Sequence, residues 1–271
     1  MPGSATVILV PHFNNLRGLK TTLHSIWHPV GIDVLVVDDG SESDQIPRVS
    51  SLENDVHENV SLEIIHINKN KGITRALNLG LDHILKKRVH EFVARLDCGD
   101  TCVVNRFLVQ ENFLNTNVEI DIVGSWVEWF DNKSGEGIFC NRPPISHKKI
   151  KQRMSIRCNI IHPSVMFRVS LVTMVGKYPL NYEAAEDYAY FFNIVNKSQT
   201  ANIPKFLTKA EFNKNGISYT KRLAQNKSKL KIVLKYGEFN FHFIYGIFYN
   251  LLLMVIPYHF LFRIKEELYR P

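Results

Sequence analysis

Two carboxylates flank a cysteine–glycine pair in the run RLDCGD, which covers residues 95–100. Asp97 and Asp100 offer the hard oxygen ligands that Mg²⁺ and Mn²⁺ prefer. The run closes the apolar segment 92–96, so it lies at the end of a predicted strand. Two interpretations follow: a divalent-cation site with Asp97 and Asp100 as ligands, or a polar turn that ends the strand.

A second acidic pair, Asp38 and Asp39, ends another apolar run and is followed by Gly40 and Ser41. A carboxylate at a strand end can accept a hydrogen bond from a nucleobase N–H or a ribose hydroxyl. The alternative is a turn in which Asp and Gly serve their backbone preferences.

The segment NKGITRALNLG, residues 70–80, places Lys71 and Arg75 beside a predicted helix that opens at Gly72. Cations near a helix N-terminus oppose the helix dipole. We therefore expect these side chains to face an anion such as a diphosphate. The alternative is a pair of solvated surface cations.

The elements that position these residues alternate between strand and helix. Apolar runs predict strands at residues 6–10, 34–37, 62–67 and 92–96, and apolar spacing predicts helices at 16–26 and 72–85. This order indicates a mostly parallel sheet with covering helices. Ligands of such sheets bind at the carboxyl ends of the strands, where the polar segments 11–14, 38–41 and 97–100 converge.

The second half has a less regular pattern. Residues 120–130 predict a strand pair or a strand with a turn, residues 165–167 a strand, and residues 184–195 a helix. The cysteines have no zinc-site spacing, and the N-terminus has no basic region ahead of an apolar stretch. We therefore expect reduced thiols and a cytoplasmic protein.

Six segments, in this order, resemble the family 2 glycosyltransferases, the inverting GT-A enzymes that use nucleotide-diphosphate sugars. They are VILVPHFNN, VVDDGS, NKGITRALNLG, ARLDCGD, NIIHPSVMFR and AEDYAYF. The resemblance runs from about Thr6 to Gln225. It implies an α/β protein of the GT-A fold, with a Rossmann-like, mostly parallel sheet, flanking helices and a C-terminal helical tail.

The resemblance also implies a binding site for a nucleotide-diphosphate sugar and a divalent cation, Mn²⁺ or Mg²⁺, held by Asp97 and Asp100. The residues expected at the nucleotide sugar are Pro11, Phe13, Asn14, Asp38, Asp39, Asn70, Gly72, Arg75, Asp97 and His162. His162 would contact the phosphates, the metal or the acceptor, or else it is a structural histidine beside a proline.

The metal motif departs from the family pattern. The usual run is D-x-D-D, and when it is laid on this sequence from Asp97 its second acid falls on Gly99. Two possibilities remain open. In the first, Asp100 replaces the missing acid as metal ligand, because Gly99 lets the backbone adopt the conformation that this requires. In the second, the metal binds through Asp97, a phosphate and water.

An inverting transferase needs a base that takes the proton of the acceptor hydroxyl. By resemblance that base is Asp187, with Glu186 beside it and Glu183 as the fallback. The alternative is an acid pair that stabilises a helix N-terminus.

The net charge of +7 is concentrated near the C-terminus. Residues 205–235 contain nine Lys and Arg but a single acid, Glu211, so this stretch alone contributes +8. Residues 239–262 are rich in aromatic and aliphatic side chains, which favours contact with a membrane surface over nucleic acid. The alternative is a C-terminal helical pair packed on the core.

The expected organisation is therefore a transferase domain at 1–225, with a nucleotide half at about 1–104 and an acceptor half at about 105–225. A basic and aromatic helical segment follows at 226–271. We expect a hexosyltransferase that moves a sugar from a UDP-linked donor to a hydroxyl of a lipid-linked glycan of a bacterial surface polysaccharide, at the inner face of the cell membrane. The alternatives are a nucleotide-sugar-binding module without transfer activity and a nucleotidyltransferase, which should carry a glycine-rich basic loop where this chain has PHFNN.

Overall fold

The computed structural model describes residues 4–103, 105–131, 134–212 and 221–256. The strands are β1 Thr6–His12, β2 Ile32–Asp38, β3 Val60–His66, β4 Phe92–Arg95, β5 Thr101–Cys102, β6 Ile120–Asp131, β7 Gly137–Asn141, β8 Met166–Arg168 and β9 Gln199–Phe212. The helices are α1 Leu16–His24, α2 Val49–Leu52, α3 Ile73–Lys87, α4 Arg106–Thr116, α5 His147–Met154, α6 Val169–Val175, α7 Glu186–Lys197, α9 Arg222–Tyr236 and α10 Phe241–Val255, with 3₁₀ turns η1 Glu53–Asp55 and η2 His162–Ser164.

The strands of the described residues form one nine-stranded sheet in the order β3-β2-β1-β4-β8-β6-β9-β5, with β7 paired to β6. The strands β3, β2, β1 and β4 are parallel, as predicted. Beyond them the sheet is mixed, because β8 runs antiparallel to both β4 and β6 while β6 and β9 are parallel. The parallel half places the ends of β1, β2 and β4 at one edge.

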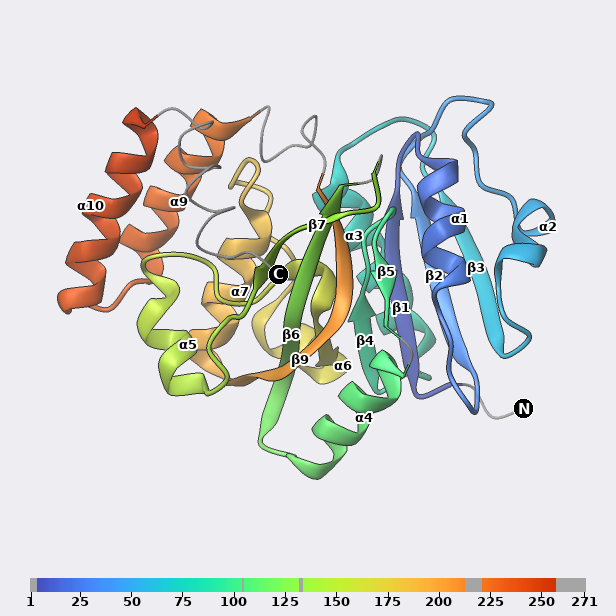
Figure 1. Cartoon of the computed structure of the whole chain (residues 1–271), viewed down its shortest axis with the longest axis horizontal. Coiled ribbons are helices and arrows are strands. Elements are labelled where there is room, and N and C mark those ends of the chain that lie inside the picture. The colour runs from blue at the N-terminus through green and yellow to red at the C-terminus, as the bar shows by residue number, and fades with distance from the viewer. Residues whose placement is uncertain (1–3, 104, 132–133, 213–220, 257–271) are drawn as a thin grey trace.

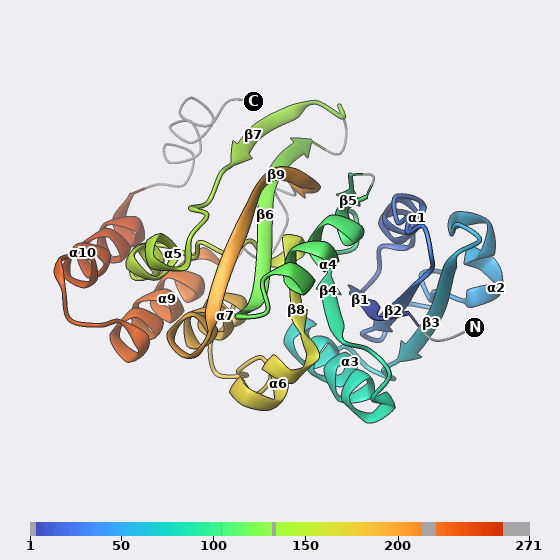
Figure 2. The same ribbon diagram turned by 90° about the horizontal axis from the view of Figure 1, so that it is seen from below.

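Helices cover both faces of this sheet (Figures 1 and 2). Alternate residues of β1 enter different cores: Val7 and Leu9 pack with α3, α6 and α7, whereas Ile8 and Val10 pack with α1 and α4. This alternation follows from the two-residue period of a strand. Because β1 is buried on both faces, it reads as an uninterrupted apolar run.

The first strand is longer than its sequence indicates. Pro11 was expected to end it, yet β1 continues to His12, and Pro11 pairs with Val37 of β2. A proline cannot donate a ladder hydrogen bond. It is accommodated here because β4 pairs with β1 only as far as Leu9, so Pro11 has a strand on one side alone.

In the second half, residues 120–130 form one long strand, β6, rather than a strand pair. Its main partner is the 14-residue β9, which the sequence analysis did not predict. β9 also pairs with β5, the short strand that follows the RLDCGD run. The C-terminal part of the sheet is thereby brought back to the predicted metal site.

The C-terminal segment forms two helices, α9 and α10, which lie side by side at one end of the molecule (Figure 1). α9 packs on α7 and places Ile232 and Val233 in the core, so the helix runs through the predicted boundary at residue 225. α10 ends at Val255; the rest of the predicted 239–262 segment, from 257 on, lies outside the described residues. Within the described part of the chain, no helix has the length and apolar character needed to cross a membrane.

Candidate active site

Asp38, the last residue of β2, is buried and its carboxylate is held by three side chains. Ser41 Oγ donates to Oδ1 at 2.5 Å, while His12 Nδ1 lies 3.0 Å from Oδ1 and His66 Nδ1 lies 3.2 Å from Oδ2. Burial raises the pKa of Asp38, but these hydrogen bonds outweigh burial and the pKa lies below its usual value. Asp38 thus ties together the carboxyl ends of β1, β2 and β3.

Asp39 holds the loop that leads into α3. Its two carboxylate oxygens accept the backbone N–H groups of Lys71 at 2.9 Å and Gly72 at 2.7 Å. Gly40 is required beside it, because a Cβ at this position would lie 2.6 Å from the backbone nitrogen of Asn70. The acidic pair therefore shapes the loops at this edge, and its contact with a nucleotide stays a prediction.

The loop after β1 is fastened to the loop after β2. Asn14, at a φ of 47°, donates its N–H to Ser41 Oγ at 2.9 Å and accepts from the Glu42 N–H at 2.8 Å. Pro11 is buried within β1. Phe13 is 46% exposed, and its contact with a nucleotide stays a prediction.

The start of α3 is electropositive. Gly72, with a φ of 90°, precedes a first turn that contains no acid, and the side chains of Lys71 and Arg75 are exposed. Asn70 is also exposed. Among the described residues, Arg75 has no ion-pair partner. These features fit the predicted role of this helix start toward an anion.

Asp97 follows β4 and is oriented by a buried arginine. Arg95 Nη2 donates to Asp97 Oδ1 at 2.6 Å, and the Asp97 side chain remains 33% exposed while Arg95 is fully buried. Arg95 Nη1 also donates to the carbonyl of Leu9, so the guanidinium is anchored to β1. Asp97 therefore stands at the sheet edge in a fixed direction.

His162 lies under the same arginine. Its Nε2 accepts from Arg95 Nε at 3.2 Å and from the Tyr178 hydroxyl at 2.9 Å, which assigns the ring proton to Nδ1. Burial and the Arg95 charge lower the pKa of His162 to about 4. His162 is thus a neutral hydrogen-bond acceptor, and its contact with substrate stays a prediction.

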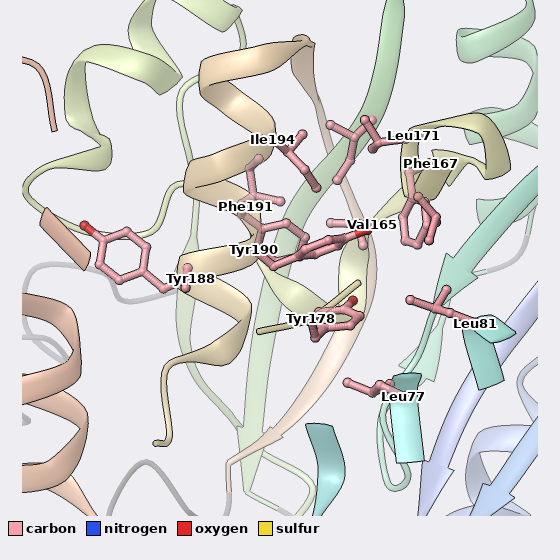
Figure 3. Close-up of a cluster of buried hydrophobic side chains, with 14 of the residues drawn as sticks. Leu77, Leu81, Val165, Phe167, Leu171, Tyr178, Tyr188, Tyr190, Phe191 and Ile194 are labelled. Carbon is pink, nitrogen blue, oxygen red and sulfur yellow. The ribbon is translucent and has the colours of Figure 1, made fainter. Parts of the chain in front are cut away.

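Tyr178 joins this cluster to α3. Its backbone N–H and C=O pair with the side-chain amide of Asn78 at 2.9 and 2.8 Å. Its ring packs against Tyr190 of α7, with the ring centres 4.3 Å apart, and lies between α7 and Leu77 of α3 in Figure 3. The asparagine at the end of the NKGITRALN motif therefore fastens the two halves of the site together.

Asp100 and Gly99 meet a carboxylate from a distant strand. Asp100 is buried and its Oδ1 accepts the backbone N–H of Glu211, in β9, at 2.8 Å. Burial and the charge of Asp97 raise the pKa of Asp100 well above its usual value. A Cβ at Gly99 would lie 2.4 Å from Oε2 of Glu211. The Glu211 carboxylate thus occupies the space that a side chain at position 99 would fill.

The predicted catalytic acids, Glu186 and Asp187, begin α7 and face the same region. Burial, and then the charge of Asp187, raise the pKa of Glu186 to about 7, with a further contribution from Asp97. The charges of Asp97 and Asp187 also act together on His162 and Tyr178. Asp97 and Asp187, ninety residues apart in the sequence, therefore act on the same buried side chains.

A family model shows what this arrangement belongs to. The model of glycosyl transferase family 2 matches residues 7–173, more than half of the chain. The chain belongs to glycosyl transferase family 2. It is a glycosyltransferase, as its six motifs predicted.

Two relatives of known name resemble this family 2 enzyme along most of its length. The amylovoran biosynthesis glycosyltransferase AmsE of Erwinia amylovora is 28% identical over 214 residues, 76% of each chain. The UDP-Gal:alpha-D-GlcNAc-diphosphoundecaprenol beta-1,3-galactosyltransferase of Escherichia coli is 27% identical over 228 residues, 83% of this chain and 77% of the relative.

Solved structures confirm the GT-A fold. Staphylococcus aureus TarS, residues 1–349, superposes with a TM-score of 0.62 at 17% identity and covers 92% of this chain and 71% of its own. The mannosyltransferase PcManGT of Pyrobaculum calidifontis, in complex with GDP-Man and Mn²⁺, superposes with a TM-score of 0.64 at 15% identity, over 93% and 70% of the two chains.

Sequence analysis missed two residues of this family 2 site. Arg95 was visible as the single charge in the apolar run FVARL. Glu211 was visible as the single acid in the basic stretch 205–235, but its partner at Gly99 lies far away in the sequence. Only the pairing of β9 with β5 and β6 brings it to the RLDCGD turn.

Proposed function

We propose that this glycosyltransferase transfers a hexose from a UDP-sugar, with inversion, to a hydroxyl of a lipid-linked glycan in the assembly of a bacterial surface polysaccharide. The names of the Escherichia coli and Erwinia amylovora relatives support the donor, the lipid-linked acceptor and the pathway class. The observation that carries the proposal is the chain of contacts from Asp97 through Arg95, His162 and Tyr178 to Tyr190 of α7, the helix that begins with Glu186 and Asp187.

The chemistry is a single displacement. Asp187 accepts the proton of the acceptor hydroxyl as its oxygen bonds to the anomeric carbon, and the bond from that carbon to the nucleoside diphosphate breaks. Glu186, with its pKa raised to about 7, stays protonated at lower pH and limits the negative charge next to the base. The base holds the hydroxyl on the face of the sugar opposite the leaving group. Attack from that face inverts the configuration at the anomeric carbon.

The donor would lie along the edge formed by the loops after β1, β2 and β4. Phe13 offers an exposed ring on which the uracil can stack, and the backbone held by Asp38 and Asp39 lines the nucleoside. Lys71 and Arg75, at the start of α3, face the diphosphate.

The residues at the RLDCGD turn fit a divalent cation by their chemistry. Asp97, Asp100 and Glu211 supply carboxylate oxygens, and Glu211 fills the space above Gly99. In the described residues, no three His, Cys, Asp or Glu side chains are arranged to hold an ion by themselves. We therefore propose that Mn²⁺ or Mg²⁺ is shared between these acids and the diphosphate; when bound, it would neutralise the leaving group.

Titration calorimetry of UDP tests this site. We expect UDP to bind the wild-type protein in the presence of Mn²⁺, and the Asp97→Ala variant to lose that metal dependence. Asp82→Ala is the matched control, because Asp82 is an exposed acid of α3 that pairs with Lys177. UDP binding that is equal with and without Mn²⁺ would contradict the metal assignment, and no UDP binding at all would contradict the uridine donor.

The C-terminal helices suit a membrane-bound acceptor. α10 exposes a continuous apolar face made of Phe241, Ile244, Tyr245, Phe248, Leu252 and Val255. α9 beside it carries exposed lysines that complement anionic head groups, namely Lys227, Lys231 and Lys235. We propose that this apolar face of α10 rests on the cytoplasmic surface of the cell membrane, so that the enzyme is peripheral there and binds no nucleic acid.

A further inference from the structure

Two polar side chains at the start of α9, those of its N-cap Lys221 and of Gln225, contact the turn that precedes α7. Lys221, Gln225 and Lys229 are spaced four residues apart, which aligns them along one side of the helix. Lys221 Nζ donates to Glu183 Oε1 at 2.8 Å, and Gln225 Nε2 donates to the Ala184 carbonyl at 2.9 Å. Lys229 Nζ donates to Gln225 Oε1 at 3.0 Å and so fixes the orientation of the Gln225 amide.

The turn that receives these contacts has an unfavourable backbone. Ala184 has a φ of 57°, a left-handed conformation that non-glycine residues adopt only when neighbours hold them there. The next residue, Ala185, is the N-cap of α7 and provides no side-chain hydrogen bond to the helix. The start of the catalytic helix therefore depends on contacts from outside the turn.

α9 is itself fixed from two other sides. Ile232 and Val233 are fully buried in the core next to α7. On the side toward α10, Arg222 Nη2 and Asn226 Nδ2 donate to the carbonyl of Leu253 at 2.6 and 3.1 Å. A helix held in this way can impose a position on the turn that it contacts.

We propose that Gln225 is a positioning residue for the transfer reaction: it holds the Ala184 turn so that Glu186 and Asp187 face the donor edge. This inference rests on the proposed function, because it takes Asp187 as the base. Electrostatics agree with the geometry: burial lowers the pKa of the half-buried Lys229, and the charge of Asp187 opposes that shift. The face of α9 that carries Gln225 therefore lies in the field of the base.

Gln225→Met tests the proposal, since methionine keeps the length of the side chain but cannot donate to Ala184. Gln152→Met, the same substitution at an exposed residue of α5, is the matched control. The first readout is hydrogen–deuterium exchange of the peptide covering residues 183–188 in the protein without ligand. We expect faster exchange in Gln225→Met than in the wild type and no change in Gln152→Met.

The second readout is transfer from UDP-galactose to a GlcNAc-diphosphate lipid. A displacement of the base by about 1 Å should lower kcat by about 100-fold, whereas the dissociation constant for UDP should not change because the donor loops are untouched. Unchanged exchange and kcat would overturn the proposal, as would losses of kcat and UDP affinity in proportion. Absence of transfer by the wild type would instead count against UDP-galactose and this lipid as its substrates, and the exchange measurement, which needs no substrate, would still decide whether Gln225 holds the turn.

Discussion

Gly99 leaves room for a carboxylate from another strand at the predicted metal site. The acid that the family pattern puts at position 99 is absent, and a carboxylate from β9 fills that space. The backbone at Gly99 has a φ of 105°, so an acidic side chain there would be strained as well as crowded. We infer that Glu211 and Gly99 are interdependent.

Glu211→Gln should therefore weaken Mn²⁺-dependent UDP binding. The amide has the same shape, but it removes a negative charge from the RLDCGD turn, and we expect a loss of about 10-fold or more in affinity. UDP binding without metal should be unchanged, and Glu119→Gln, at an exposed acid, serves as control. Equal affinities of wild type and Glu211→Gln in Mn²⁺ would exclude Glu211 from the metal site.

Glu186 makes a second prediction, about stability and pH. Burial and the charge of Asp187 raise its pKa from 4.5 to about 7. The folded protein therefore keeps a proton that the unfolded chain loses, so this residue's contribution to stability falls as pH rises from 4.5 to about 7. Removing the ionisation with Glu186→Gln should leave stability near wild type at pH 5 and raise it by up to about 3 kcal/mol at pH 8.

Urea unfolding of both proteins at the two pH values measures this difference. A variant that is less stable than the wild type at pH 8 would show that the Glu186 carboxylate is favoured by its surroundings, contrary to its raised pKa. We expect Glu186→Gln to gain stability at pH 8 and to lose activity, because an active site often keeps groups that destabilise the folded protein.

At the level of single residues, the sequence indicated the location of the site better than the roles within it. Asp38 and Asp39 were correctly placed at a strand end, since a polar residue after a buried strand must reach the sheet edge. Their carboxylates, however, bind His12, Ser41 and the α3 loop. Hydrogen bonds between loops of different strands have no local signal, so these roles could not be read from the pattern.

Among the helices and strands, local periodicity predicted the parallel half well. β2, β3, β4 and α3 lie within a few residues of their predicted positions. β9 was missed because its sequence, QTANIPKFLTKAEF, mixes apolar, charged and proline residues. It is stabilised mainly by pairing with β6, which only the folded chain provides.

The apolar face of α10 yields the prediction at this scale. Phe241→Ser combined with Phe248→Ser should reduce binding to phosphatidylglycerol-containing vesicles by at least about 10-fold, because each buried Phe contributes about 1.5–3 kcal/mol. Both side chains are strongly exposed in the protein alone, at 77% and 67%. Cosedimentation with vesicles measures binding, and Val118→Ser, at an exposed apolar residue of another surface, is the control.

Vesicle binding should also fall as salt is raised, because the lysines of α9 contribute through their charge. If the wild-type protein stays in the supernatant with anionic vesicles, α10 does not bind membranes. The exposed face would then need another partner.

At the scale of the whole molecule, one sheet runs through the nucleotide half and the acceptor half, and Asn78, Tyr178 and Tyr190 connect α3 with α7 across the middle. The family resemblance predicted this fold because six motifs kept their order. It could not place the tail, since the packing of α9 on α7 depends on long-range contacts.

A single cooperative unfolding transition follows from this architecture. With UDP and Mn²⁺ at 100 times the dissociation constant, the free energy of unfolding should rise by about 2.7 kcal/mol, which shifts the whole transition by about 5–11 °C. Calorimetric scans with and without ligand measure this shift. Two transitions, of which only one responds to UDP, would show that the halves unfold independently.

The most direct test of the account is transfer itself, with Asp187→Asn as the comparison. Purified wild-type protein is incubated with Mn²⁺, a panel of UDP-hexoses and a GlcNAc-diphosphate lipid, and the glycolipid product and its anomeric configuration are determined. We predict a β-linked product from the α-linked donor, and a loss of about 100-fold or more in kcat for Asp187→Asn with UDP binding retained. A product of retained configuration, or an Asp187→Asn variant as active as the wild type, would contradict the assignment of Asp187 as the base of an inverting transfer.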